Sequence, residues 1–159
     1  MSTTIRIDGV KETLAELRQV DPKIRKAFTT NAKSIAKPAI TVAQNRYRSL
    51  QFPSGTYRQW NYGGKEIFPL NSNKAAKSIN VKISGAKKKS TAIAIVNSYA
   101  GAGVFEFAAS GNLGAAFNAK NGPVARVMWP SVTSTENGIE REMAMLVEAL
   151  QEEINRSLK

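Results

Sequence analysis

The sequence predicts an α+β domain: a twisted antiparallel sheet of three or four strands, flanked by a long, kinked N-terminal helix and a C-terminal amphipathic helix. Three observations lead to this prediction. Apolar residues recur near the helical period of 3.6 across residues 21–50 and again across 139–158. Between these stretches, residues 79–83 and 91–96 alternate with the period of two that half-buried strands show. Strands grouped between helices are typical of the α+β class.

The chain has 159 residues, which predicts a single domain over residues 1–159 that is long enough to bury a core. Cysteine and histidine are both absent. Their absence removes disulfides, thiolate nucleophiles, imidazole bases and the usual zinc ligands. The remaining carboxylates, lysines, serines and tyrosines show no catalytic spacing. The sequence therefore predicts no catalytic residue, no metal site and no cofactor, and an enzyme is the poorest functional class.

No stretch of the sequence approaches the roughly 18 apolar residues that a membrane-spanning helix needs. Residues 1–10 also lack the apolar run behind a basic start that marks a signal peptide. We therefore expect no membrane contact.

Charge is distributed very unevenly along the chain. Residues 1–90 hold 18 Lys plus Arg against 5 Asp plus Glu, a balance of +13. Residues 91–159 hold 5 against 7, a balance of −2, and the two sum to the net charge of +11. Such asymmetry favours a polyanionic partner, which is either nucleic acid or an acidic protein surface.

The N-terminal third is expected to be helical after one short edge strand at residues 5–7. A first helix is predicted to begin at Asp8, with apolar residues at i, i+4 and i+7. Asp21-Pro22 gives a stronger start signal, because Pro is tolerated at the first helical position. From there we expect one long helix to about Leu50, kinked at Pro38, which removes a backbone hydrogen bond.

One face of this long helix is predicted to be basic. A solvated helix surface and a binding surface explain such a face equally well. Its residues are Lys23, Lys26, Lys33, Lys37, Arg46 and Arg48.

Residues 52–73 lack periodicity and contain two Pro, three Gly and five aromatic residues, which predicts a long loop or a hairpin arm. Tyr57, Trp60 and Tyr62 surround the cation of Arg58. Such a group can stack on bases or anchor a protein interface. Exposed Trp and Tyr in a loop fit a protein contact better.

A β-hairpin is predicted next, with strands at 74–84 and 91–96 joined by a turn over 85–90. Ile79, Val81 and Ile83 share one face of the first strand. The turn adds three lysines to the candidate basic surface, where they either solubilise the turn or contact phosphate. They are Lys87, Lys88 and Lys89.

The last third is expected to contain a second long loop, a short strand and a helix. Residues 108–123 are rich in Gly, Ala and Asn, which predicts a flexible excursion or a segment ordered by a neighbouring subunit. Residues 124–129 are predicted to form the strand. Thr133 and Glu136 form a capping-box signature before the C-terminal helix. The apolar face of that helix comprises Ile139, Met143, Leu146, Val147, Leu150, Ile154 and Leu158.

The segment after the second hairpin strand is unusual. Asn97-Ser98 ends the strand, a run of small residues follows, and Glu106 then stands between two phenylalanines. A turn followed by a short packed helix would explain this composition. The pattern Tyr99-Ala100 followed by Glu106-Phe107 also resembles the head–tail joining or tail-completion proteins of tailed phages, which are related to the lambda-like minor tail protein Z.

The resemblance extends over nearly the whole chain in the order of elements. Lys77-Ser78-Ile79 matches the segment that opens the family's hairpin, and Trp129-Pro130 matches the proline element before its last helix. Two features depart from the family pattern: Ala108 stands where glycine is usual, and the gap between Tyr99 and Glu106 is longer.

The resemblance implies a structural virion protein without catalytic activity. It implies a homo-oligomeric ring, a hexamer in the particle, in the neck between the DNA-filled head and the tail, assembled in the host cytoplasm. Its partners would be the head connector and tail proteins, with at most non-specific DNA contact in the ejection channel. Alternatives are a tail terminator ring that caps the tail tube and, from another class, a basic nucleic-acid-binding module. The candidate contact residues are Tyr57, Arg58, Trp60, Tyr62, Tyr99, Glu106 and Phe107.

Overall fold

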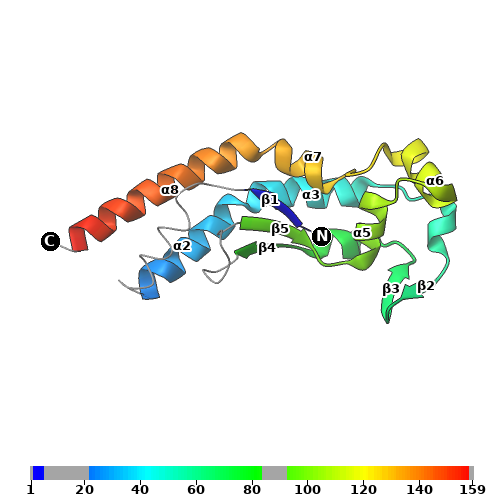
Figure 1. Ribbon diagram of the computed structural model, residues 1–159, viewed down its shortest axis with the longest axis horizontal. Helices are drawn as coiled ribbons and strands as arrows, with labels where there is room; N and C mark the ends of the chain where they lie inside the picture. The colour runs from blue at the N-terminus through cyan, green and yellow to red at the C-terminus, as the bar shows by residue number, and fades with distance from the viewer. Residues whose placement is uncertain (1, 6–21, 84–92, 158–159) are drawn as a thin grey trace.

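The computed structural model describes residues 2–5, 22–83 and 93–157, and it has the predicted α+β class. The elements are β1 (Ser2–Ile5), α2 (Pro22–Ile35), α3 (Lys37–Ser49), the 3₁₀-helix η1 (Ser54–Tyr57), β2 (Trp60–Tyr62), β3 (Lys65–Phe68), α4 (Ser72–Lys77), β4 (Ile79–Ile83), β5 (Ile93–Asn97), α5 (Ala100–Phe107), α6 (Gly111–Asn121), α7 (Met128–Thr133) and α8 (Glu136–Ser157). Figure 1 shows an elongated molecule, with α2 and α8 extending from one end and the β2–β3 hairpin projecting from the other.

The main sheet has the strand order β1-β5-β4, and both pairs are antiparallel. The predicted hairpin forms from β4 and β5, with Val81 opposite Ile95. The first strand is shorter than predicted, because residues 74–77 belong to helix α4 and β4 begins at Ile79. Ile95 is fully buried and Lys82 is exposed, so the sheet has one apolar and one wet face, as the alternation predicted. The predicted turn at 85–90, with its three lysines, lies outside the described residues, as do Arg6 and Ile7 and the predicted helix from Asp8.

The single kinked helix that the sequence predicted is replaced by two helices, α2 and α3, separated at Ala36. Pro38 lies in the first turn of α3, where it has no N–H to donate to the carbonyl of Ser34. The helical path is therefore broken there, rather than bent within one helix. The buried face of α2 nevertheless continues into the buried face of α3. Its residues are Phe28, Ala32, Ala36, Ala39, Ala43 and Tyr47.

Residues 52–73 do not form a long loop, since they contain η1 and the β2–β3 hairpin. Gly63 and Gly64 both have positive φ, at 56° and 72°. Two such residues make the tight turn that matches the twist of a two-stranded ribbon. Strands of three and four residues are too short to show a period in the sequence, which is why only the hairpin-arm alternative anticipated them.

The predictions of a second long loop at 108–123 and of a strand at 124–129 are also wrong. Residues 111–121 form α6, which the alanine-rich composition supports and the burial of Phe117 stabilises. Residues 124–127 have no regular structure, and α7 begins at Met128. Pro130 is tolerated in α7 because it lies in the first turn, where its missing N–H has no helical partner.

The C-terminal helix α8 is confirmed, although Thr133 is not its cap. Thr133 belongs to α7, and α8 begins at Glu136. The described part of the predicted apolar face is buried or half-buried, and α8 packs on α2 along it. Leu158 lies outside the described residues. Within the part of the chain that the structure describes, no helix is long and apolar enough to cross a membrane.

Candidate functional site

Three groups of buried side chains hold together the part of the molecule that carries the β2–β3 hairpin. A buried carboxyl group joins α5 to α3 and α7, a buried guanidinium closes the end of α5, and a tyrosine clamp holds the β2–β3 hairpin. The exposed aromatic residues at that hairpin and an exposed row of cations are two surfaces that partners could contact.

The carboxyl group of Glu106 is fully buried in α5 and accepts hydrogen bonds from three donors. Tyr47 of α3 donates its hydroxyl at 2.7 Å. The backbone N–H of Val127 lies 3.1 Å from both carboxyl oxygens, and that of Met128 lies 3.0 Å from Oε1. Because these amides open α7, the negative group also lies at the positive end of that helix. Glu106 therefore joins three helices that are distant in sequence.

Arg126 closes the C-terminal end of α5. Its guanidinium donates to the carbonyl oxygens of Phe105 and Ala108, and to Gly122 through Nε at 2.9 Å. The guanidinium carbon lies 5.4 Å from the ring centroid of Phe105 and 5.3 Å from that of Phe117. Burial lowers the pKa of Arg126, while the negative charge of Glu106 opposes that shift. The Arg126 side chain is thus fixed by acceptors and aromatic rings on several sides.

Tyr99 binds the β2–β3 hairpin at the C-terminal end of β3. Its hydroxyl proton is shared between the carbonyl oxygens of Ile67, at 3.2 Å, and Pro69, at 3.0 Å. Asn97 sets the position of Tyr99, because its Oδ1 accepts from the Tyr99 N–H at 3.0 Å while its Nδ2 donates to Ala75 at 3.0 Å. Burial raises the pKa of the Tyr99 hydroxyl, which keeps it a donor.

Gly101 brings α5 against strand β3. A Cβ at this position would lie 2.5 Å from the carbonyl oxygen of Ile67 and 2.6 Å from the Tyr99 ring. Only glycine allows this close approach of backbone to backbone. On the outer side, Lys74 pairs with Glu66 of β3 at 2.9 Å and lies 5.1 Å from the centroid of the Tyr99 ring. The base of the hairpin is thereby fixed to the body of the protein.

The hairpin and the preceding η1 expose the aromatic group that the sequence predicted as a contact surface. Tyr57 is 60% exposed, Trp60 is 47% exposed and Tyr62 is 74% exposed. The Trp60 ring leans on Phe68, with centroids 5.5 Å apart, so Trp60 does not fill the core. Arg58 is also exposed. Such a group of accessible aromatic residues and a cation is typical of a protein contact.

The predicted contact residues therefore separate into two groups. Tyr57, Arg58, Trp60 and Tyr62 lie together in η1, in β2 and on the short connection between them, while Phe107 is 60% exposed at the end of α5. Tyr99 and Glu106 were expected at a contact surface, but both are buried and hold the subunit's own fold. Their polar atoms are used within the chain, because the neighbouring helix ends and turns need donors and acceptors.

The candidate basic surface is exposed in part. Lys26, Lys33 and Lys37 occur at i, i+7 and i+11, and Arg48 follows 11 residues later, so they follow one face along α2 and α3. All four side chains are exposed, and we call them the basic stripe. Arg46 is half-buried. The side chain of Lys23 and the residues Lys87, Lys88 and Lys89 lie outside the described part.

Sequence reasoning missed Tyr47, Asn97 and Arg126 as organising residues. Tyr47 falls on the apolar face of α3 at i+4 from Ala43, a spacing that could have indicated its burial. The sequence offers no signal for Arg126, because its partners are mostly backbone carbonyls brought together by the fold.

Among the described residues, no group of three or more His, Cys, Asp and Glu side chains is placed to hold a metal ion. Comparison with known proteins found no matching family model, and neither a curated protein nor a solved structure is significantly similar to this chain.

Proposed function

We propose that this chain is a structural subunit of a ring in the neck of a tailed phage, where it joins the DNA-filled head to the tail. The role is assembly and sealing, with no chemical step. The resemblance of Tyr99-Ala100 and Glu106-Phe107 to the head–tail joining family supports this proposal, as do the β4–β5 hairpin before them and the amphipathic helix α8 after them. In this picture, the sheet and its flanking helices form the wall of the ring, and the partners are the head connector and tail proteins.

The observation that carries the proposal is the way Tyr99 presents the hairpin. This residue of the family-like pattern fixes Ile67 and Pro69 at the base of β3, while the same hairpin exposes Trp60 and Tyr62. A contact surface that is already held in place loses less conformational entropy on binding. Exposed aromatic residues on a fixed hairpin are therefore suited to repeated, specific docking in a particle.

The experiment is complementation in a tailed phage that encodes this chain. We expect the double variant Trp60→Ala/Tyr62→Ala to be soluble and to melt close to the parent, because both side chains are exposed. Electron microscopy of the lysate should then show separate filled heads and tails. Trp129→Ala is the matched control, since Trp129 is an equally accessible tryptophan, 59% exposed, on α7. Normal particles made without any copy of this chain would refute the proposal.

The position of the chain in the particle separates the neck ring from the tail terminator. An antibody or gold label on the C-terminus should mark the junction in complete phage and should be absent from tails that have not met a head. A label found on the end of isolated tails would instead favour the terminator ring that caps the tail tube.

The basic stripe favours a second candidate, direct nucleic-acid binding. Four exposed cations along one face can neutralise phosphates, and the affinity of such contacts falls steeply with salt. We expect only weak binding to duplex DNA without sequence preference, which Lys33→Glu/Lys37→Glu should weaken further. Tight, sequence-selective binding by the isolated chain at moderate salt would reverse the ranking of the two functions.

A further inference from the structure

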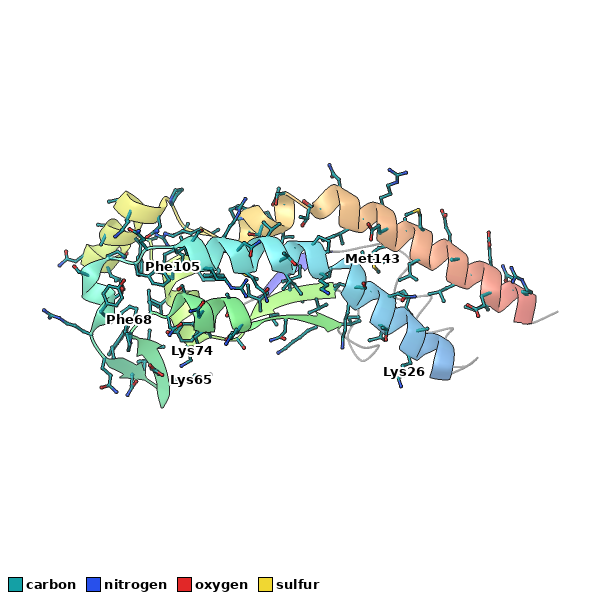
Figure 2. All side chains as sticks on the ribbon, turned by 180° about the vertical axis from the view of Figure 1, so that it is seen from behind. Lys26, Lys65, Phe68, Lys74, Phe105 and Met143 are labelled. Carbon is teal, nitrogen blue, oxygen red and sulfur yellow. The ribbon has the colours of Figure 1, made fainter. Side chains whose placement is uncertain are left out.

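The elongated molecule carries two exposed surfaces of complementary character at some distance from each other. The first is the hairpin arm, residues 54–68, with its three exposed aromatic residues. The second is a cleft between α2 and α8, which we call the helical cleft; its volume is about 510 Å³, and it is lined by Asn31, Ser34, Ile35, Glu142, Met145 and Leu146. Figure 2 shows Lys65 of the arm at one end of the molecule and Lys26 of α2 near the other end.

The hairpin arm offers aromatic side chains together with positive charge. Tyr62 and Tyr57 are more than half exposed and Trp60 nearly so. Arg58 and Lys65 are exposed as well, whereas Glu66, the acidic residue of this segment, is paired with Lys74. The free charge of the arm is therefore positive, beside a set of side chains that release water when they are covered.

The helical cleft offers apolar side chains together with one acidic residue. Ile35 and Leu146 are half-buried, and Met145 stands 50% exposed at its edge. Methionine adapts its shape to aromatic partners and makes favourable sulfur–ring contacts. The charged residue among the described lining is Glu142. The helix α8 as a whole carries six Glu against two Arg, a balance of −4, whereas α2 on the other side of the cleft carries four cations and no acid, a balance of +4, so the charge that the arm meets in the cleft is that of Glu142 itself. The cleft is thus an open depression that offers three apolar side chains, two neutral polar side chains and one carboxyl group.

The arm does not reach the cleft of its own chain. Figure 1 shows the β2–β3 hairpin projecting at the end opposite to the extended α2 and α8, with the sheet and α3 between them. An occupant with the chemistry of the arm must therefore come from another molecule. A second copy of this chain supplies it, because every copy carries one arm and one cleft.

We propose that the hairpin arm of one copy docks into the helical cleft of the next copy, with Tyr62 and Trp60 against Met145 and with Arg58 or Lys65 facing Glu142. The proposal rests on the assembly role proposed above and names the subunit contact that role needs. Such a contact joins different surfaces of the two copies, so repeated docking closes a ring if the rotation closes. Charge complementarity then sets the orientation of the arm in the cleft.

The absence of native cysteine makes disulfide mapping the direct test. The full-length single variants Tyr62→Cys and Met145→Cys are purified with tags of different mass, mixed at high concentration and oxidised. We expect the mixed disulfide to dominate over either homodimer, because arm and cleft meet only between different copies. Mass spectrometry of the linked peptides identifies the pair. Ala115→Cys, exposed on α6, replaces each partner in turn as the collision control and should give only background linking.

Charge reversal gives an independent readout of the same contact. Arg58→Glu and Glu142→Arg should each weaken self-association, measured by analytical ultracentrifugation, by at least about tenfold, as expected when like charges meet at an interface. The double variant Arg58→Glu/Glu142→Arg should recover most of the loss, because each contact again pairs opposite charges. Failure of this rescue, together with linking no greater than the Ala115→Cys background, would overturn the proposal.

Three other results would also overturn it. Dominant Tyr62→Cys homodimers would mean that arms pair with arms. Protection of Met145→Cys in a verified monomer would mean that the cleft is covered within one chain. Linking of the arm to a head or tail protein, and not to another copy, would assign it to a different partner.

Failure of this inference is distinguishable from failure of the proposed function. Suppose that the label on the chain marks the neck of the particle, but oxidised particles contain no link between Tyr62→Cys and Met145→Cys of different copies. The neck assignment is then supported and the arm–cleft contact is refuted. If the link forms in purified protein but phage particles lack the chain, the arm–cleft contact is supported and the neck assignment is refuted.

Discussion

The hydroxyl of Tyr47 donates a 2.7 Å hydrogen bond to Glu106 across 59 residues of sequence, and both side chains are fully buried. The carboxyl group also accepts from two amides at the start of α7. A carboxylate inside a protein is costly unless several donors surround it. Here donors from α3 and α7 meet one acceptor from α5, so these hydrogen bonds stabilise one relative arrangement of the three helices.

Removal of the Tyr47 hydroxyl should destabilise the protein without altering its shape. Tyr47→Phe keeps the ring in the core but deprives Glu106 of one donor, and we expect a loss of about 1.5–3 kcal/mol in the free energy of unfolding. Urea denaturation at pH 7 measures the loss. Tyr57→Phe, on an exposed side chain, should stay within about 0.5 kcal/mol of the parent. An equal effect of both substitutions would show that the buried bond contributes nothing.

The same pair predicts how stability responds to alkaline pH. Burial, followed by the charge of Glu106, raises the pKa of Tyr47 above its ordinary value of 10.0. In the folded protein Tyr47 therefore stays neutral where the unfolded chain ionises, so the unfolded state binds fewer protons and stability falls as pH rises. The stabilisation is fully present below pH about 10 and is lost above it, by up to about 1.4 kcal/mol per pH unit.

Tyr47→Phe cannot ionise, so its deficit relative to the parent should shrink as the pH rises above about 10. Denaturation of both proteins at pH 7, 9, 10 and 11 measures this difference, and other groups that titrate cancel between them. A deficit that is constant or grows with pH would contradict the prediction.

Glu106→Gln should weaken the connection between α5 and α7. The amide side chain retains one acceptor oxygen but turns an NH₂ group toward donors, and the charge-assisted bonds to Val127 and Met128 are lost. We expect a cost of about 1.5–3 kcal/mol and faster hydrogen exchange at the Val127 and Met128 amides. Glu140→Gln, exposed on α8, is the control and should leave both measurements unchanged. Retained protection of the two amides would argue against the role assigned to the carboxyl group.

Two glycines of α5 should respond in opposite directions to the same substitution. Gly101→Ala places a Cβ 2.5 Å from the Ile67 carbonyl oxygen, which must move, and we expect a loss of about 1–3 kcal/mol. Gly103→Ala meets nothing within 4 Å and should stabilise the helix by about 0.5–1 kcal/mol. Thermal and urea unfolding of both variants test the pair. If Gly101→Ala were as stable as Gly103→Ala, α5 would not lie against β3 as described.

Arg126→Lys should be destabilising although it keeps the charge. Lysine lacks the planar fork that reaches the carbonyl oxygens of Phe105 and Ala108 while lying between two aromatic rings. We expect a loss of about 1–3 kcal/mol, because acceptors at the end of α5 are left without donors. Arg141→Lys, exposed on α8, should be neutral by the same unfolding measurement. Equal stability of the two variants would show that positive charge alone matters at position 126.

Local patterns in the sequence by themselves determined several strands and helices of this protein. The alternation at 79–83 and in the described part of 91–96, together with the helical spacing across 139–154, predicted β4, β5 and α8, because each pattern depends on which side chains face the core. The aromatic group around Arg58 was also visible in the sequence as an exposed cluster.

Only the tertiary structure determined the helix that begins at Met128 and the roles of Glu106 and Tyr99. Residues 124–129 had the composition of a strand, yet Glu106 binds the amides of Val127 and Met128 and starts a helix there. Glu106 and Tyr99 were read as contact residues, but burial with intramolecular partners makes them internal supports. The physical reason is the same in each case: hydrogen bonds between residues about 20 to 60 positions apart overrule local preference, and a sequence does not show which distant groups the fold will bring together.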